Sequence, residues 1–342
     1  MRTSSKHNWT FSTAAAALAA ASLLLACCAG QRKAPDPRSL PYKQASAYSA
    51  DIGASLARSV PERIGEAPPA LLDYLRRMDR NSSYAAYVPT EAERALFAEY
   101  YATLPQAFKA AMDSRLLGVY FIENFEGGGM SDYVFRGDGS MLTTLILNRQ
   151  VLESSLQDWI QYRDGSPYFD DGHGVELRSR VEGGGAYKGL IQTLTHEAAH
   201  LYDYVEHATP YVEPHLASPS DGPSSKDFTR GAWAGYSRPE PAFSIPRLAE
   251  TAAYGLGKRL PISVAAEQYA ALAKTPYASL YGAGSWAEDF AESSAWTWLD
   301  ERLGIAYSVS VLRGGTEIAR FAPGLGPASD ARKASLRVIL GL

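Results

Sequence analysis

One segment restricts the fold of this chain more than any other, the stretch from Lys188 to His207. Its apolar residues recur at intervals of three and four positions, which predicts a helix with one buried face. The residues on that face are Leu190, Ile191, Leu194, Ala198, Leu201, Tyr202 and Val205. Because such a helix needs a core to cover it, we expect the rest of the chain to fold around this segment.

The same helix carries His196, Glu197 and His200 in the sequence HEAAH. Two histidines four positions apart project from one side of a helix, so their ring nitrogens can reach a single zinc ion. Glu197 is rotated by about 100° from His196, which places its carboxylate beside the metal. There it can act as a general base and accept a proton from an attacking water. The motif therefore predicts a catalytic zinc site.

Two histidines leave such a site one protein ligand short. Both cysteines, Cys27 and Cys28, lie close to the N-terminus, so the folded part has no thiolate to offer. The third ligand must therefore be a histidine or a carboxylate. One known arrangement places a histidine six residues after the second histidine, beyond a glycine turn. This chain has Glu206 and Asp203 at those two positions, which excludes that arrangement.

Two further histidines, His207 and His215, are not fixed at a ligand position by their spacing. Asp203 and His207 do share the helical stripe of the two motif histidines. We therefore expect Asp203, with His207 as a further candidate, to hold a ligating imidazole from outside the metal's coordination shell.

A better third ligand lies downstream in the sequence EDFAE, within a predicted helix at residues 285–303. Trp286 and Phe290 give this helix a buried face, while Glu288 and Glu292 align four positions apart on another. Two acids on one face repel each other unless a cation neutralises them. We expect Glu288 to bind the metal and Glu292 to accept the outer N–H of a ligating imidazole.

In its HEAAH and EDFAE motifs the chain resembles the gluzincin metallopeptidases, and within them the anthrax lethal factor-like catalytic domain. The resemblance covers roughly residues 186–300. It implies a zincin-like fold, Zn²⁺ held by His196, His200 and Glu288, and a tyrosine whose hydroxyl stabilises the oxyanion. Tyr281 stands seven positions before Glu288, where that group has its tyrosine, although Tyr277 is close by.

The resemblance also implies the reaction, hydrolysis of peptide bonds in a peptide or protein substrate with Glu197 as the general base. The long separation of His200 from Glu288 requires an insertion near residues 209–243. Two other functions remain open. The chain could be a non-catalytic envelope lipoprotein that uses the fold for binding, or a zinc amidase that acts on cell-wall peptides.

The N-terminus predicts export. Arg2 and Lys6 precede an apolar run that ends at Cys27, the order of a secretory signal, and the run is short for a membrane-spanning helix. Leu24 to Cys27 (LLAC) resembles the lipobox of bacterial lipoproteins, which implies a signal peptide at 1–26 and a lipid on Cys27. Residues 27–60 then form a flexible tether to the membrane. Cys28 is an alternative lipidation site, and without lipidation the protein would be secreted from the bacterial envelope.

The remaining pattern predicts an α+β fold in which a small mixed sheet precedes the HEAAH helix. The catalytic domain spans 61–342 and begins with a helical part, 61–115, that Pro105 interrupts. Expected strands are 117–122, 133–135 and 141–147, the last with an edge open to a peptide. Helices are expected at 151–162, 246–260 and 264–273, and loops at 164–185 and 209–243. The net charge of −4 argues against nucleic acid as a partner.

Overall fold

The computed structural model describes residues 36–210, 228–324 and 330–342, and its architecture is α+β, as the sequence predicts. The helices are α2 (Ile52–Ala57), α3 (Pro69–Met78), α4 (Glu91–Thr103), α5 (Gln106–Arg115), α6 (Gln150–Glu153), α7 (Leu156–Gly165), α8 (Leu190–Glu206), α9 (Ala265–Leu272), α10 (Trp286–Leu303) and α11 (Asp330–Leu340). The strands are β1 (Ile64–Gly65), β2 (Ala85–Tyr87), β3 (Leu116–Glu123), β4 (Gly129–Phe135), β5 (Met141–Asn148), β6 (Tyr168–Phe169), β7 (Val175–Glu182), β8 (Trp233–Gly235), β9 (Arg238–Pro239), β10 (Leu260–Pro261), β11 (Ala306–Arg313) and β12 (Thr316–Phe321).

A mixed sheet precedes α8 in the chain, as predicted. Its order is β1-β3-β5-β4, with β2 also paired to β3; β3 and β5 are parallel, and β4 is antiparallel to β5. The apolar runs of β3 and β5 are buried on both faces, which is typical of interior strands. The prediction that residues 141–147 present an open edge is wrong, because β3 and β4 occupy both sides of β5. The outer strand is β4.

A second sheet has the antiparallel order β12-β11-β7. Its strand β7 lies inside the loop predicted for 164–185, and that prediction is wrong. The sequence VELRSRVE alternates strictly between buried and exposed residues, so its many charges belong to the solvent face of a strand. Helix α7 packs on β7, and α9 packs on β12.

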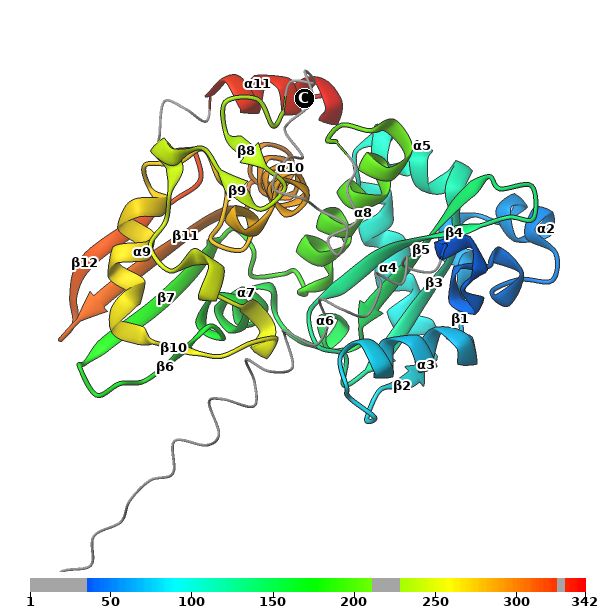
Figure 1. Cartoon of the computed structure of the whole chain (residues 1–342), viewed down its shortest axis with the longest axis horizontal. Helices are drawn as coiled ribbons and strands as arrows, with labels where there is room; N and C mark the ends of the chain where they lie inside the picture. The colour runs from blue at the N-terminus through cyan, green and yellow to red at the C-terminus, as the bar shows by residue number, and fades with distance from the viewer. Residues whose placement is uncertain (1–35, 211–227, 325–329) are drawn as a thin grey trace, which may run out of the picture. The chain divides into compact units, whose positions relative to one another are not determined.

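Helices α8 and α10 pack against each other, with α8 also contacting β4 and α5. Figure 1 shows this helix pair between the β3–β5 strands and the β7–β11 strands. The apolar face of helix α8 is buried, as predicted, and burial also extends to polar residues outside that face. Pro105 separates α4 from α5, so the predicted interruption of the N-terminal helices is confirmed.

Residues 41–342 form one unit, and the chain before Pro41 forms another, in which the structure describes only the short turn Pro37–Ser39 after Asp36. The flexible tether predicted for 27–60 is therefore wrong from residue 41 onward. Lys43 is buried in an ion pair with Asp132, Ala45 is fully buried, and Gln44 bridges to Phe135 of β4. These small and polar residues pack on the body instead of linking it. Residues 1–35, with the signal peptide and Cys27, lie outside the described residues.

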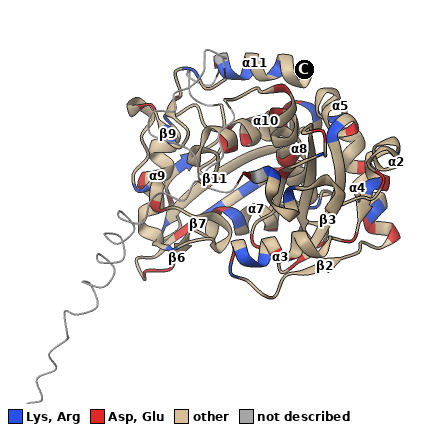
Figure 2. Ribbon diagram, turned by 45° about the vertical axis from the view of Figure 1, so that its right-hand side comes forward, with Lys and Arg blue, Asp and Glu red and all other residues tan. Residues whose placement is uncertain are grey.

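The helix predicted for 246–260 is also wrong. Only short 3₁₀ turns occur there, Leu248–Glu250 and Ala253–Gly255. Arg247 and Tyr254 take left-handed backbone angles, with φ of 55° and 59°, which an α-helix cannot accommodate. Within the described ranges, no helix is both long and apolar enough to cross a membrane. Figure 2 shows acidic and basic residues dispersed over many elements, without a continuous basic stripe.

Candidate metal centre

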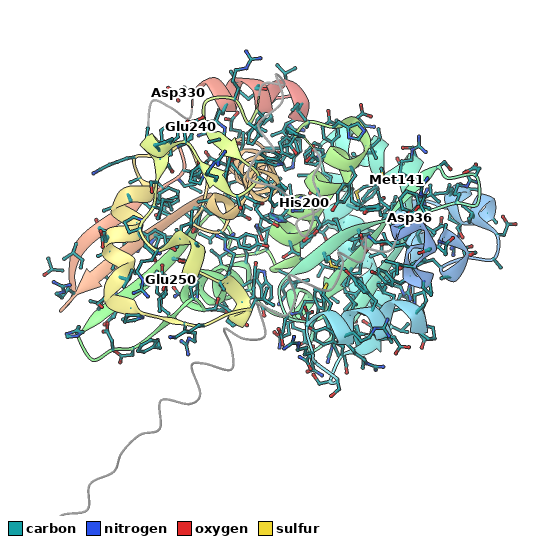
Figure 3. The ribbon with its side chains drawn as sticks, in the orientation of Figure 1. Asp36, Met141, His200, Glu240, Glu250 and Asp330 are labelled. Atoms are coloured by element: carbon teal, nitrogen blue, oxygen red, sulfur yellow. The ribbon has the colours of Figure 1, made fainter. Side chains whose placement is uncertain are left out.

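The motif residues lie in the middle of α8, where the helix is covered on several sides. The helix begins after Gly189, at which any Cβ would lie 2.7 Å from Trp159, so the close packing there requires glycine. His196 and Glu197 are buried, and His200 is half-buried one turn further on. In Figure 3, His200 lies near the centre of the view, surrounded by side chains from several elements.

Helix α10 brings the carboxylates to this point. Ser285 caps the helix by accepting a hydrogen bond from the backbone N–H of Glu288, which lies in its first turn. Glu288 is half-buried and faces α8, and Glu292 follows one turn later with no exposed surface. The packing of α10 on α8 therefore places both acids beside the motif histidines.

His196, His200 and Glu288 form a group that could hold a metal ion. Nε2 of His196 lies 3.1 Å from Nε2 of His200. Oε2 of Glu288 lies 3.2 Å from the first of these nitrogens and 3.5 Å from the second. This oxygen is buried and accepts no hydrogen bond within the described residues, so a bound cation would satisfy it.

The electrostatics of the group favour a positive charge at its centre. Burial lowers the pKa of His196, but the contacts with Glu288 and Glu292 raise it more, to about 10. Burial likewise raises the pKa of Glu288, and His200 and His196 outweigh it, so that this carboxyl titrates far below its usual range. Two carboxylates beside His196 make a cation favourable at this position.

Glu292 contacts His196 from behind, as the sequence predicts. His196 Nδ1 lies 3.0 Å from Glu292 Oε1, which also accepts a hydrogen bond from Gln192. The second oxygen, Oε2, accepts hydrogen bonds from Trp296 Nε1 and from Arg163 Nη1, the latter at 2.8 Å. Both oxygens are satisfied, so the carboxylate fixes the orientation of the imidazole ring.

Arg163, on α7, was not found by the sequence reasoning. Its guanidinium is buried and donates to Glu292 through Nη1 and to Asp164 through Nε, at 2.9 Å. Asp164 in turn accepts hydrogen bonds from Ser179 of β7, at 2.6 Å, and from Tyr307 of β11, at 2.7 Å. An alternating row of charges thus runs from the second sheet to His196.

Glu197 points toward β4 of the first sheet. Its Oε2 accepts a hydrogen bond from Ser131 Oγ at 2.8 Å. At Gly129 any Cβ would lie 2.9 Å from Cγ and Oε1 of Glu197, so the carboxylate occupies space that only glycine leaves free. Burial raises the pKa of Glu197, while His196 and His200 oppose the shift.

Of the two candidate tyrosines, only Tyr281 is found beside the histidines. Its ring centroid lies 5.8 Å from that of His196, and its side chain lines a cavity together with Glu288. Tyr277 is buried elsewhere, and its hydroxyl donates to the carbonyl of Ala232 at 2.8 Å. The structure therefore brings Tyr281, and not Tyr277, to the candidate site.

No hydrogen bond joins Asp203 to a motif imidazole within the described residues, although His200 is near enough to oppose the rise that burial causes in the pKa of Asp203. Its carboxylate accepts hydrogen bonds from the backbone N–H and the hydroxyl of Thr209, so it closes the C-terminal end of α8. The expectation that it holds a ligating imidazole is wrong. His207 takes a left-handed conformation as the C-cap of the helix, and His215 lies outside the described residues.

A second contact unseen in the sequence lies next to Glu288. Asp289 is fully buried and accepts a hydrogen bond from Trp233 Nε1 at 2.7 Å, and it forms an ion pair with Arg332 of α11. These contacts anchor the first turn of α10, which presents Glu288.

Comparison with known proteins gives no match: no family model, no curated protein and no solved structure is similar to this chain.

Proposed function

We propose that this protein is a zinc-dependent metallohydrolase, a peptidase of the gluzincin type with a zincin-like fold. The observation that carries the proposal is the convergence of His196, His200 and Glu288 beside Glu197. Ligand atoms around a tetrahedral zinc, each at about 2.0–2.1 Å, lie about 3.3–3.4 Å from one another. The separations of 3.1, 3.2 and 3.5 Å agree with that spacing, and two imidazoles with one carboxylate form a donor set typical of catalytic zinc.

Zinc held there would polarise the substrate carbonyl and make a bound water acidic. Glu197 accepts a proton from the attacking water and returns it to the leaving amine. Ser131 holds this carboxylate in place through its hydrogen bond. Tyr281 donates a hydrogen bond to the carbonyl oxygen as negative charge develops on it, a contribution of about 2.7–4 kcal/mol for donors of this kind.

An extended peptide is the substrate that the first sheet accommodates. Among the described strands, β4 pairs only with β5, apart from the bridge between Gln44 and Phe135 at its far end. Gly129 of β4 lies close to Glu197, and the carbonyl oxygen of Ser131, two residues on, accepts a hydrogen bond from Tyr204. A substrate backbone that paired with β4 at Gly129 would bring its carbonyl to the metal, whatever its side chains. Lipidation of Cys27 would confine the reaction to the bacterial cell envelope.

Metal analysis combined with digestion assays tests the proposal. The full chain should purify with about one equivalent of zinc and should cleave casein or an unbiased peptide mixture. Glu197→Gln should keep the zinc but lose activity by about 10²–10⁴-fold, because only the general base is removed. Glu301→Gln, on the exposed side of α10, is the matched control and should behave as the parent. Full activity in Glu197→Gln, or a chain that binds no zinc, would refute the mechanism.

A further inference from the structure

Two neighbouring cavities lead away from the candidate metal centre. The first, of about 280 Å³, is lined by Glu288 and Tyr281 of that centre. The second, of about 480 Å³, is lined in part by Glu250, which Figure 3 labels. Thr251 and Ala252 line both cavities, so the two adjoin each other at this wall. A substrate that extended from the metal through the first cavity would therefore reach the second.

Hydrogen bonds to the body of the protein fix the walls of the second cavity. Gln268 of α9 is fully buried, and its side-chain nitrogen donates to the hydroxyl of Thr251 at 2.9 Å. That hydroxyl donates in turn to the carbonyl of Arg247 at 3.0 Å. Leu260, which also lines this cavity, donates its backbone N–H to the carbonyl of Pro167 at 2.8 Å. A ligand would therefore meet a site that is already formed.

The described residues that line the second cavity carry an excess of positive charge. They include three cationic side chains and one carboxylate, a net charge of +2, from Arg247, Lys258, Arg259 and Glu250. Arg247 donates to both oxygens of Glu250, at 3.0 and 2.8 Å, so these two charges offset each other. The side chains of Lys258 and Arg259 are exposed and form no hydrogen bond or ion pair within the described residues. They can therefore attract a ligand carboxylate, although the chain as a whole has a net charge of −4.

Other carboxylates of this region do not remove the excess of positive charge at the cavity. Asp170 and Asp171, in the loop after β6, do not line it. Their carboxylates accept hydrogen bonds from the backbone N–H groups of Gly172, His173 and Ser263. Lys258 helps Arg247 to lower the pKa of Glu250, so two cations share one carboxylate. A carboxylate of the ligand would offset the charge that remains.

Apolar side chains are exposed in the walls of both cavities. Leu256 lines the first cavity with 52% of its surface exposed, and Phe169 lines the second with 42% exposed. Exposed apolar side chains that are scattered singly need no explanation, whereas two that line adjoining cavities are typical of a binding surface. A ligand that covered both side chains would have to extend from one cavity into the next.

From these observations we infer that the two cavities form one extended substrate-binding cleft, and that its second part selects an acidic side chain of the substrate. Lys258 and Arg259 attract that carboxylate, while Leu256 and Phe169 contact neighbouring residues of the substrate. The substrate class is an extended polypeptide with an acidic residue away from the cleaved bond, and not a dipeptide or a single amide. The inference rests on the proposed peptidase function, and it names the substrate class of that same site.

A peptide library tests the cleft through its sequence preference. The full zinc-loaded chain is given random peptides in which each position in turn is fixed as aspartate, asparagine or lysine, and the products are sequenced. We expect a position, not adjacent to the cleaved bond, at which aspartate raises the rate of cleavage about fivefold over asparagine and lysine lowers it. This preference should vanish at about 1 M salt, because exposed charges are then screened. Cleavage with no such preference would overturn the inference and leave the peptidase function standing.

Reversal of the two cations tests the assignment to this cavity. Lys258→Glu combined with Arg259→Glu should reverse the preference, so that lysine is favoured over aspartate at the same position. Both residues are exposed, so thermal unfolding of the variant should match that of the parent. Lys274→Glu combined with Arg320→Glu is the matched control, because it changes the net charge equally at exposed sites that line neither cavity. A preference for aspartate that survives the reversal of Lys258 and Arg259 would overturn the inference.

Binding separates this inference from the function on which it rests. The Glu197→Gln chain, alone and with both cations reversed, is immobilised and exposed to the same library, and the retained peptides are identified by mass spectrometry. Retention of aspartate peptides that depends on Lys258 and Arg259, beside a parent chain that cleaves nothing, would support the cleft and refute the peptidase. Retention that does not favour aspartate, or retention of no peptide, would refute the cleft, whatever the parent chain cleaves.

Discussion

The two sheets support the same pair of helices, but by different chemistry. The first sheet contacts Glu197, the proposed general base: the uncharged hydroxyl of Ser131 on β4 donates to its carboxylate and lies equally close to its backbone carbonyl, and Gly129 leaves room for it. The second sheet supports a candidate metal ligand through charges, from Asp164 through Arg163 and Glu292 to His196. One side of the site is positioned by shape, and the other by a buried row of ions.

Because of this difference, substitutions near Glu197 and substitutions near His196 should affect different properties of the protein. Buried charges are costly when one partner is removed, so changes on the second sheet's side should lower stability and metal affinity together. Changes at Ser131 and Gly129 on the first sheet's side alter neither a candidate metal ligand nor the buried ion pair of Lys43 with Asp132. They should lower the rate of hydrolysis and leave the metal in place.

The largest effect is expected at Arg163. Arg163→Met leaves the carboxylates of Asp164 and Glu292 buried without their partner, which should lower the free energy of unfolding by about 3–5 kcal/mol. Arg178→Met is the control, because the ion pair of Arg178 with Glu176 is exposed and should contribute only about 0–1 kcal/mol. Urea denaturation of both variants measures the difference, and similar losses would contradict the contrast between the sheets.

Gly129→Ala tests the first sheet's side by shape. The added Cβ would lie 2.9 Å from Cγ and Oε1 of Glu197 and 3.0 Å from the carbonyl oxygen of Ile146, so the carboxylate must move. A misplacement of about 1 Å should lower kcat about 10²-fold, with zinc affinity unchanged. Gly137→Ala, where a Cβ meets nothing within 4 Å, should have no effect. A parallel fall in zinc affinity would show that the two sides are not separate.

Glu292→Gln tests the second sheet's side without changing its shape. The amide keeps the size of the carboxylate but weakens its hold on His196, which should lower zinc affinity about 10–100-fold. Competition with a chelator measures the affinity. Glu301→Gln serves as the control on the same helix, since Glu301 pairs with Arg337 at the surface. Unchanged zinc affinity in Glu292→Gln would show that the row of charges does not contribute to metal binding.

The smallest effect is expected at Ser131. Ser131→Ala removes one hydrogen bond to the Glu197 carboxylate, which should lower kcat roughly tenfold and leave zinc affinity and stability nearly unchanged. Ser140→Ala, at the turn after β4, is the control. Steady-state kinetics with the zinc-loaded chain decides the outcome, and a kcat equal to the parent value would show that Gly129 alone positions the base.

The sequence allowed α8 to be predicted because its apolar periodicity is strong. Helix α10 was predicted from Trp286 and Phe290, although its burial extends around most of the helix. His196, His200 and Glu288 come together as that pattern indicates. Strand β7 was missed because its exposed charges resemble those of a loop, although its alternation is regular. Residues 41–60 were mistaken for a tether because small and polar residues can pack as readily as they can link.

The supporting residues of the site could not be predicted from local pattern. Arg163 and Asp164 are adjacent charges in a short helix, a pattern that usually indicates a solvated surface. Their burial depends on Glu292 and Tyr307, which lie far away in the chain and meet them only in the folded protein. The prediction for Asp203 failed for a different reason. Its position on the helix was correct, but its carboxylate accepts a hydrogen bond from the backbone N–H of Thr209 instead of from an imidazole.

The contacts of α10 also have a consequence for the time at which the site forms. Glu288 is presented by a helix whose first turn is anchored by Arg332 of the C-terminal helix, and the hold on His196 reaches Tyr307 of β11. A nascent chain that has exposed HEAAH but not these residues lacks a metal ligand and its supports. The candidate metal centre can therefore form with all of these contacts only after synthesis has passed Arg332.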